Sequence, residues 1–359
     1  SSLTDSGRIH GSVFEMYLRT AALAGRIERV DQASGETALW PAGQRPYAWG
    51  SLFFAWLPDR HGDERMADFV DAVAGQWIPY RLNAAARDAF GTSFSDEWRE
   101  WTDSVSVAAR EAAERIEARS DLQRGELLTT DGRQMRRPRV SPVGSRLAVA
   151  RADGRSDTGI SIRAPVVRGD GGESNVERAW VRTNGLAAFD WLPDGGLLYS
   201  QFEREGPWRL YGDLYHVTAD GRERRLTEGA RLDHPSAAPN GQWAAAIRTR
   251  PGATDLVRVN LDDGSLSVIA EGSSAVYWAD PAVSPDGRWI AAARWTPGSV
   301  YQVVVVDAAT GALRVVVDDA RGVATRPSWM PDGGTVVFVS DRSGTPNVYA
   351  RRVDPVAGG

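Results

Sequence analysis

The stretch VSPDGRWIAAA (Val283–Ala293) has the composition of a tight turn that leads into a strand. Pro285 presets φ at the first corner of the turn, Asp286 can accept hydrogen bonds from the nearby backbone, and Gly287 tolerates a positive φ. The residues that follow are apolar with some alternation, as in a half-buried strand. The stretch therefore predicts a turn between two neighbouring strands.

The same pattern, Pro-x-Gly followed by an apolar run, occurs five times. Its prolines are spaced 51, 46, 46 and 46 residues apart and are Pro142, Pro193, Pro239, Pro285 and Pro331. Further β-rich runs follow each turn, and second glycine turns at Gly221, Gly264 and Gly311 precede a fourth strand. A period of about 40–50 residues with four strands per unit is typical of a β-propeller. The sequence thus predicts a propeller with five recognisable blades.

The repeats carry a further signature in PSWMPDGGTVVFVSDRSGTPNVYARRV (Pro327–Val353) and RLTEGARLDHPSAAPNGQWAAA (Arg225–Ala246). They resemble the TolB-like propeller repeat, in which leucine-threonine precedes a proline, a Ser-Pro-Asp-Gly turn and a Ser-Asp-Arg-x-Gly turn. The resemblance covers about residues 125–353. It implies the fold and, for function, a platform for a protein or peptide partner, either alone or beside a peptidase domain.

Composition limits the functions that the chain can have. Its 359 residues leave room for two domains, and the net charge of −5 falls entirely within residues 1–120. No basic face is indicated, so nucleic acid is not an expected partner. The chain contains no cysteine, which excludes disulfides, thiolate ligands and a cysteine nucleophile. It shows no transmembrane run and no signal peptide, and its abrupt start at SSLTDSGRIHG favours a fragment of a longer protein.

Residues 1–120 have helical rather than strand periodicity, and they predict an all-α subdomain that precedes a propeller over residues 121–359. SVFEMYLRTAALAG should form a helix that has Val13, Met16, Tyr17, Leu18 and Ala21 on one side and ends at Gly25. The segment YAWGSLFFAWL (Tyr47–Leu57) is apolar nearly all round and should be a buried helix. Ser95 should cap a later helix that directs Trp98 and Trp101 into the core.

This helical region resembles the C-terminal helical part of gluzincin-type, peptidase MA-like zinc metallopeptidases. The matching segments are PYAWGSLFFAWLPDRHGDERMADFVDAV and AARDAFGTSFSDEWREW. The resemblance implies zinc for the complete protein, and it implies that the Tyr47 hydroxyl donates to the developing oxyanion. The alternative for Tyr47 is a buried structural tyrosine.

The zinc motif of that family, H-E-x-x-H, is missing. The four histidines are His10, His61, His216 and His234; none precedes the required glutamate, and no two lie three or four apart. We therefore expect no metal ligands and no cofactor in this chain, which should be inactive alone because the catalytic part lies outside it. His10 and His61 are expected at solvated positions in loops.

Two functions remain open. In the first, the chain is part of an exported bacterial zinc peptidase whose propeller positions a substrate or partner. In the second, it is a non-catalytic TolB-like binding module of the cell envelope. Both imply a periplasmic or secreted protein with a protein or peptide partner on the propeller face. A serine peptidase is not expected, because no G-x-S-x-G motif occurs.

The fifth repeat stops at PVAGG after its third strand. Glu126–Thr130 could supply the missing strand and close a five-bladed ring. The alternative, which we favour, is that the ring is cut and that this segment pairs with a blade that is absent.

Overall fold

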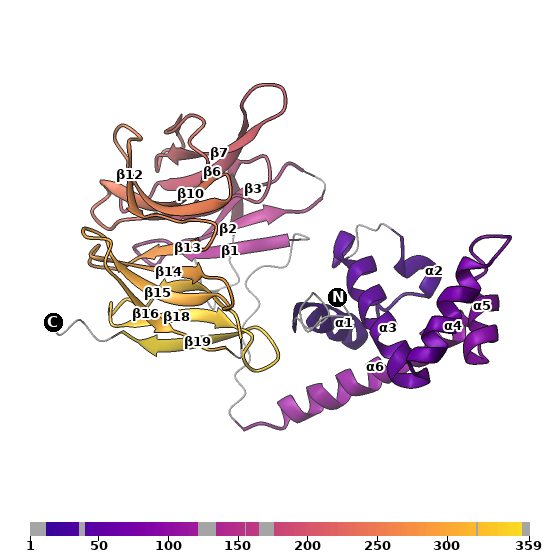
Figure 1. Cartoon of the computed structure of the whole chain (residues 1–359). Coiled ribbons are helices and arrows are strands. Elements are labelled where there is room, and N and C mark those ends of the chain that lie inside the picture. Colours follow the sequence, from indigo (N-terminus) through magenta and orange to yellow (C-terminus); the bar gives the residue numbers. More distant parts are fainter. Residues whose placement is uncertain are drawn as a thin grey trace. The chain divides into compact units, whose positions relative to one another are not determined.

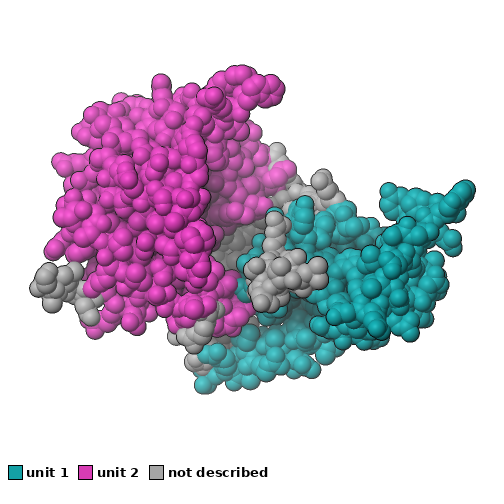
Figure 2. All heavy atoms as spheres, viewed as in Figure 1, with its two compact units in different colours: residues 1–125 teal, residues 126–359 magenta. Residues whose placement is uncertain are grey.

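The computed structural model describes residues 12–35, 40–120, 134–154, 156–164, 176–320 and 322–353. The chain divides into two compact units, residues 1–125 and 126–359, which Figure 2 colours separately. Each unit has its own apolar core, and the two are described separately below.

The first unit is helical. In its described part six helices and a short helical turn follow one another (Figure 1): α1 (Ser12–Leu23), α2 (Val30–Ala33), η2 (Ala42–Gln44), α3 (Arg45–His61), α4 (Asp63–Ala74), α5 (Leu82–Phe90) and α6 (Phe94–Glu117). Phe53 lies at the centre of the core, with its ring centroid 5.0 Å from that of Trp98 and 5.4 Å from that of Trp101. As predicted, both tryptophans are buried.

Helix α1 ends as its sequence predicts. Gly25 has φ 63°, its N–H donates to the carbonyl of Ala22, and the N–H of Arg26 donates to that of Ala21. These two bonds form a Schellman motif, which satisfies carbonyls at the helix end. Of the residues expected on one side, Leu18 and Ala21 are buried and Val13 is exposed, while Phe14 is also buried.

The predictions for α3 and α6 need correction. Helix α3 is not buried all round: Ala48, Trp49, Phe53 and Leu57 form its inner face, while Tyr47 and Phe54 are 59% and 42% exposed. The segment is apolar nearly throughout, so its composition does not indicate which side of the helix faces the core. The cap of α6 is Ser93 and not Ser95, since the Ser93 hydroxyl accepts the N–H of Asp96 at 3.1 Å.

The second unit confirms the predicted fold class, a β-propeller that follows an all-α region (Figure 1). Its described strands form five antiparallel meanders, which are β1–β4 (Gln134–Val140, Leu147–Ala152, Gly159–Ala164, Val176–Arg182), β5–β8 (Phe189–Trp191, Leu197–Arg204, Leu210–Val217, Glu223–Arg225), β9–β12 (Leu232–Ala237, Trp243–Arg250, Ala253–Asn260, Leu266–Ala270), β13–β16 (Tyr277–Val283, Trp289–Trp295, Gln302–Asp307, Leu313–Val317) and β17–β19 (Ala324–Trp329, Thr335–Ser340, Asn347–Arg352).

Each Pro-x-Gly turn joins the first strand of a sheet to the second. In the turn that leads into β14, the N–H of Gly287 donates to the carbonyl of Ser284 at 2.9 Å, and Asp286 accepts the N–H of Arg288 at 3.0 Å. The glycines of the five turns all have positive φ, between 66° and 84°. The proline and the positive-φ glycine that predicted the turns are therefore present in all five, whereas the first turn has Val143 in place of the hydrogen-bonding Asp or Asn.

The leucine-threonine signature connects one blade to the next. Thr227, which precedes β9, donates its hydroxyl to Oδ1 of the buried Asp213 on β7 at 2.8 Å and accepts the N–H of Leu214. Asp213 also accepts the N–H groups of Gly229 and Ala230. A buried carboxylate on the third strand thus holds the loop that leads into the following blade.

The last sheet has three strands, as the sequence predicts, and β19 pairs only with β18 among the described strands. The predicted partner, Glu126–Thr130, lies outside the described residues, so both expectations for ring closure remain predictions. None of the described helices has the length and apolar character needed to cross a membrane.

Candidate binding site at the propeller axis

The first strands of the five sheets, β1, β5, β9, β13 and β17, meet around one axial cavity of about 450 Å³. Its walls include the proline turns and polar side chains such as Asp190, Ser236 and Ser328. These strands are the elements that bring residues of all five repeats together, because equivalent positions lie about 46 residues apart in the chain. Candidate functional residues are therefore those that the first strands present to the axis.

Four of the five first strands carry the same distortion. Each contains a β-bulge at an X-Pro pair: Arg137-Pro138, His234-Pro235, Asp280-Pro281 and Arg326-Pro327. The residue before each proline has φ between 48° and 56°. Positive φ in a residue other than glycine costs about 1–3 kcal/mol and persists only where the surrounding structure enforces it, commonly at functional sites. The fifth strand, β5, has Ala188-Phe189 at this place.

The bulges bring ionisable side chains from distant repeats into contact. Nη2 of Arg137 donates to Nε2 of His234 at 2.7 Å, and the same nitrogen of His234 lies 3.4 Å from Oδ1 of Asp280. Nδ1 of His234 lies 3.4 Å from Oδ2 of Asp233. The backbone N–H of Arg326 donates to Oδ2 of Asp280 at 3.3 Å. We call Arg137, Asp233, His234, Asp280 and Arg326 the axial cluster.

The cluster fixes the protonation state of His234. A guanidinium can only donate, so Nε2 accepts from Arg137 and the proton of a neutral imidazole is on Nδ1, facing Asp233. Burial lowers the pKa of His234; Asp233 and Asp280 oppose this shift, and Arg137 and Arg326 reinforce it. Burial likewise lowers the pKa of Arg137, although an arginine remains protonated at neutral pH.

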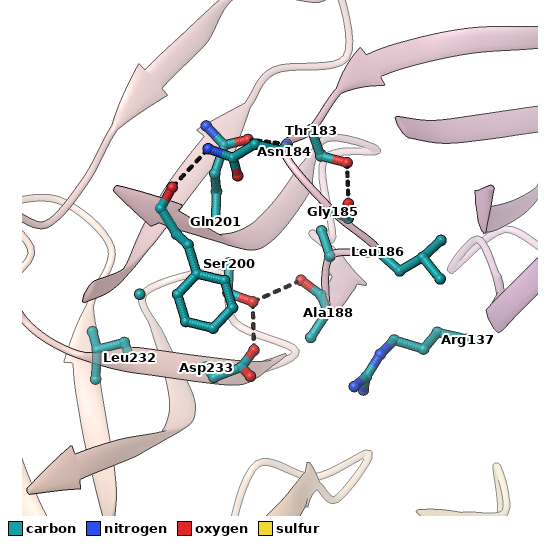
Figure 3. A pocket seen from close by; sticks show the side chains of 13 residues that line it. Arg137, Thr183, Asn184, Gly185, Leu186, Ala188, Ser200, Gln201, Leu232 and Asp233 are labelled. Carbon is teal, nitrogen blue, oxygen red and sulfur yellow. Dashed lines mark hydrogen bonds between the residues drawn. The ribbon is translucent and has the colours of Figure 1, made fainter. Parts of the chain in front are cut away.

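Two small pockets adjoin the cluster and share Phe202, Leu232 and Asp233. One, of about 80 Å³, also contains Arg137 and the apolar side chains of Leu186 and Ala188 (Figure 3). The other, of about 270 Å³, contains Arg231.

Figure 3 shows the guanidinium end of Arg137 directed toward Asp233. Asp233 is held in place by Ser200, whose hydroxyl donates to its Oδ1 at 2.6 Å.

The charges of the axial cluster and of the neighbouring Arg231 are unequal. Arg137, Arg231 and Arg326 stand against Asp233 and Asp280, with His234 neutral. Arg326 is exposed, and within the described ranges its guanidinium makes no ion pair. Arg231 stacks on Tyr211, with its guanidinium 4.1 Å from the ring centroid. The arrangement can bind a carboxylate beside an apolar group.

The residues singled out from the sequence lie elsewhere. Tyr47 is in the first turn of α3, and its exposure of 59% shows that the alternative of a buried structural tyrosine is wrong. His61 is not a solvated loop residue: it ends α3, stacks on Phe90, and its Nε2 lies 3.1 Å from the buried Glu97. His10 lies outside the described residues. In the described part no group of three or more histidines and carboxylates could hold a metal ion.

The axial cluster was missed in the sequence although it leaves a trace there. In four of the five repeats, a second proline stands four residues before the turn proline, as in Pro235 and Pro239 or Pro281 and Pro285. The residue before it is Arg, His, Asp or Arg in turn. Ionisable residues at one position of a repeat that surrounds an axis would have indicated this site.

Comparisons with known proteins place the propeller among related folds. No family model matches the chain. An uncharacterised protein of Agrobacterium fabrum is 27% identical over 158 residues, which cover 42% of this chain and 53% of that protein. The chain thus spans about half the length of the curated relative that it matches.

Among solved structures, a protein described as a putative TolB from Agrobacterium tumefaciens is 23% identical and has a TM-score of 0.44; the match covers 60% of this chain and 73% of that one. TolB from Acinetobacter baumannii is 18% identical and has a TM-score of 0.47, with 62% and 55% covered. A prolyl endopeptidase is also 18% identical, with a TM-score of 0.42 and 84% and 41% covered. The gluzincin resemblance of the helical unit gains no support from these proteins. The second unit is a β-propeller whose described strands form five sheets.

Proposed function

We propose that the chain is a protein-binding module whose propeller takes an extended segment of a partner at the axial cluster. The segment carries a carboxylate next to a small apolar side chain. The observation that supports this most is the set of four strained X-Pro bulges, which hold Arg137, His234, Asp280 and Arg326 together at one end of the axis.

The charge pattern favours an acidic partner. Arg326 is exposed and has no ion pair among the described residues, while Arg137 is already hydrogen-bonded to His234. A carboxylate that reaches Arg326 gains a charge-assisted hydrogen bond, which contributes about 1.5–3 kcal/mol. Asp233 and Asp280 repel a second acid close by, so one carboxylate fits this end of the channel better than an acidic run.

The apolar part of the segment has a place beside the cluster. The smaller pocket is walled by Leu186, Ala188 and Leu232 and opens next to Arg137 (Figure 3). Phe202, which is 55% exposed, borders both pockets. An exposed aromatic side chain next to a fixed charge is a common anchor for a peptide.

A random peptide library selected on the immobilised chain tests the proposal. We expect the enriched peptides to share an aspartate or glutamate beside an apolar residue. Calorimetry with the best peptide should then show that Arg326→Gln weakens binding by about tenfold or more, since 1.4 kcal/mol corresponds to a factor of ten. Replacing the acid in the peptide by its amide should have the same effect.

Arg288→Gln is the matched control. Arg288 is also exposed, but it follows a proline turn at the other end of the first strands and faces Asp307. Its replacement should leave the affinity unchanged. Selection of peptides without acids, or equal losses for the two arginine variants, would contradict the proposal.

The wider setting rests on the resemblances alone. A periplasmic or secreted location and a zinc peptidase as the complete protein stay proposals, with Tyr47 as the donor to the oxyanion. Metal analysis of this chain after dialysis against zinc tests the part that concerns it. We expect no stoichiometric zinc, and one tightly held equivalent would contradict this.

A further inference from the structure

The helical unit contains a cavity of about 720 Å³, a volume within the range of small-molecule sites. Its walls come from α2, α3, α5, α6 and the residues that precede α5 (Figure 1). Aromatic side chains dominate the walls: Trp49, Phe53 and Phe54 from α3, and Phe94 and Trp98 from α6. The cavity lies wholly within the first unit and is separate from the axial cluster.

The wall also holds a donor without an acceptor. Trp49 is 1% exposed, and its indole N–H has no hydrogen-bond partner among the described residues. Leaving a buried donor unsatisfied costs about 1–3 kcal/mol. The nitrogen is enclosed within the wall and is not open to the cavity, so Trp49 offers a ligand apolar surface and not its N–H.

Positive charge gathers at one side of the cavity. Arg81 and Arg87 lie on the wall, and neither guanidinium makes an ion pair within the part that the structure describes. Helix α5 begins there, and no side chain caps its N-terminus. The one acid on the wall, Asp31, already pairs with Arg29 at 3.2 Å. Two arginines and a helix N-terminus together favour an anion.

We propose that the helical unit binds an organic acid with one carboxylate and an apolar, preferably aromatic, body. The body packs against Trp49, Phe53 and Trp98, and the carboxylate lies on Arg81 and Arg87 at the start of α5. A polyanion does not fit, because the aromatic walls would leave most of its charges unpaired. This site is independent of the proposed function of the propeller, and either can fail without the other.

Calorimetric titration of the full chain with 2-naphthoate tests the proposal, with 2-naphthamide as the neutral counterpart of equal size. We expect the acid to bind at least about tenfold more tightly than the amide, and the preference to fall as salt rises. Arg87→Gln and Arg81→Gln should remove the preference while leaving the amide affinity unchanged. Arg110→Gln, an exposed position of α6 outside the wall, should change neither affinity.

A cavity-filling variant locates the site. Gly50 lies on the wall in the middle of α3, and a Cβ at its position would meet nothing within 4 Å. Gly50→Leu should therefore keep the fold, verified by an unchanged or higher thermal midpoint, and abolish binding of both probes. Equal binding of acid and amide, no saturable binding of the acid, or normal binding by Gly50→Leu would overturn the proposal.

Discussion

His234 illustrates how one residue connects the backbone to the chemistry of the channel. Pro235 removes a backbone donor from β9, and the bulge there turns His234 to φ 53°. A residue before proline normally adopts an extended conformation. The distortion carries the imidazole to Arg137, which lies 97 residues away in the chain. Its protonation therefore reports on the whole axial cluster.

We expect the propeller to lose stability as the pH falls, in part through His234. Burial holds the pKa of His234 below its ordinary value of 6.5, so the unfolded chain binds a proton more readily than the folded one. The contribution of neutral His234 to the free energy of unfolding is complete above pH 6.5, and it is lost as the pH falls through the pKa that His234 has in the folded protein. Urea unfolding between pH 7.5 and 5 should show a smaller pH dependence for His234→Gln than for the wild type.

His216 must be separated from this effect, because burial lowers its pKa as well. It lies on β7, and the double variant with His216→Gln should flatten the profile further. A wild-type profile that His234→Gln leaves unaltered would show that the proton is bound elsewhere.

At the scale of the element, the proline turns are packed against one another. A Cβ at Gly287 would lie 3.4 Å from the ring of Pro239, the proline of the preceding turn. The equivalent distances are 3.7 Å from Gly241 to Pro193 and 4.0 Å from Gly333 to Pro285. Each turn thus needs glycine because of its φ, and from the third turn on the glycine also faces the preceding blade.

Gly287→Val should lower the free energy of unfolding by about 1–3 kcal/mol, because a β-branched residue is forced to positive φ. Gly287→Asn is the matched control, since asparagine tolerates this region, and it should lose less. Thermal unfolding of both variants measures the difference. Equal losses for valine and asparagine would mean that contact with Pro239, and not the backbone conformation, sets the requirement.

The helices show where prediction at this scale ends. The end of α1 at Gly25 depends on neighbouring residues only, and it was predictable. Ser93 and Ser95 both have the composition of a cap, and the choice between them depends on Asn83, which accepts both the N–H and the hydroxyl of Ser95. The exposure of Tyr47 depends equally on the packing of several helices. Contacts between elements are not recorded in local composition.

At the scale of the molecule, the fold was predictable because it repeats. Five copies of one turn at a near-constant spacing determine the number of sheets and their order of strands. The axial cluster could not be derived in the same way, because X-Pro normally predicts extended backbone and the contacts join different repeats. The aromatic cavity of the helical unit likewise exists only through the packing of helices around it.

Successive blades are also held together by buried carboxylates. Asp255 on β11 is fully buried and accepts bonds from Arg250, Arg248 and the N–H of Gly272 in the loop that leads to β13. Burial alone would raise the pKa of Asp255, but these hydrogen bonds outweigh it and lower the pKa well below the ordinary 3.8. The stabilisation of the folded state by the Asp255 carboxylate is therefore present above about pH 4, and it is lost as the pH falls through the pKa that Asp255 has in the folded protein.

Asp255→Asn should lower the free energy of unfolding at pH 7 by about 1.5–3 kcal/mol, because it weakens charge-assisted hydrogen bonds to two arginines that remain partly exposed to water. The difference from the wild type should shrink below pH 3.8, because there the Asp255 carboxyl of the unfolded wild type takes up a proton while that of the folded protein does not. Asp263→Asn, at an exposed turn, is the control and should have little effect. Urea unfolding measures the free energy of unfolding of both variants. Equal losses of stability would show that the hydrogen bonds of Asp255 do not hold the two blades together.

The fit of each turn glycine against the preceding proline has a consequence for how such a protein can change over generations. The repeats of Pro239 and Pro285 each present a proline to one neighbouring blade and a glycine to the other. A gene segment that encodes one such repeat, when duplicated in frame, yields a blade that already matches the surfaces on both sides. Deletion of one repeat rejoins two surfaces of the same kind. The length of this array can therefore be altered by recombination without any compensating substitution at the new junction.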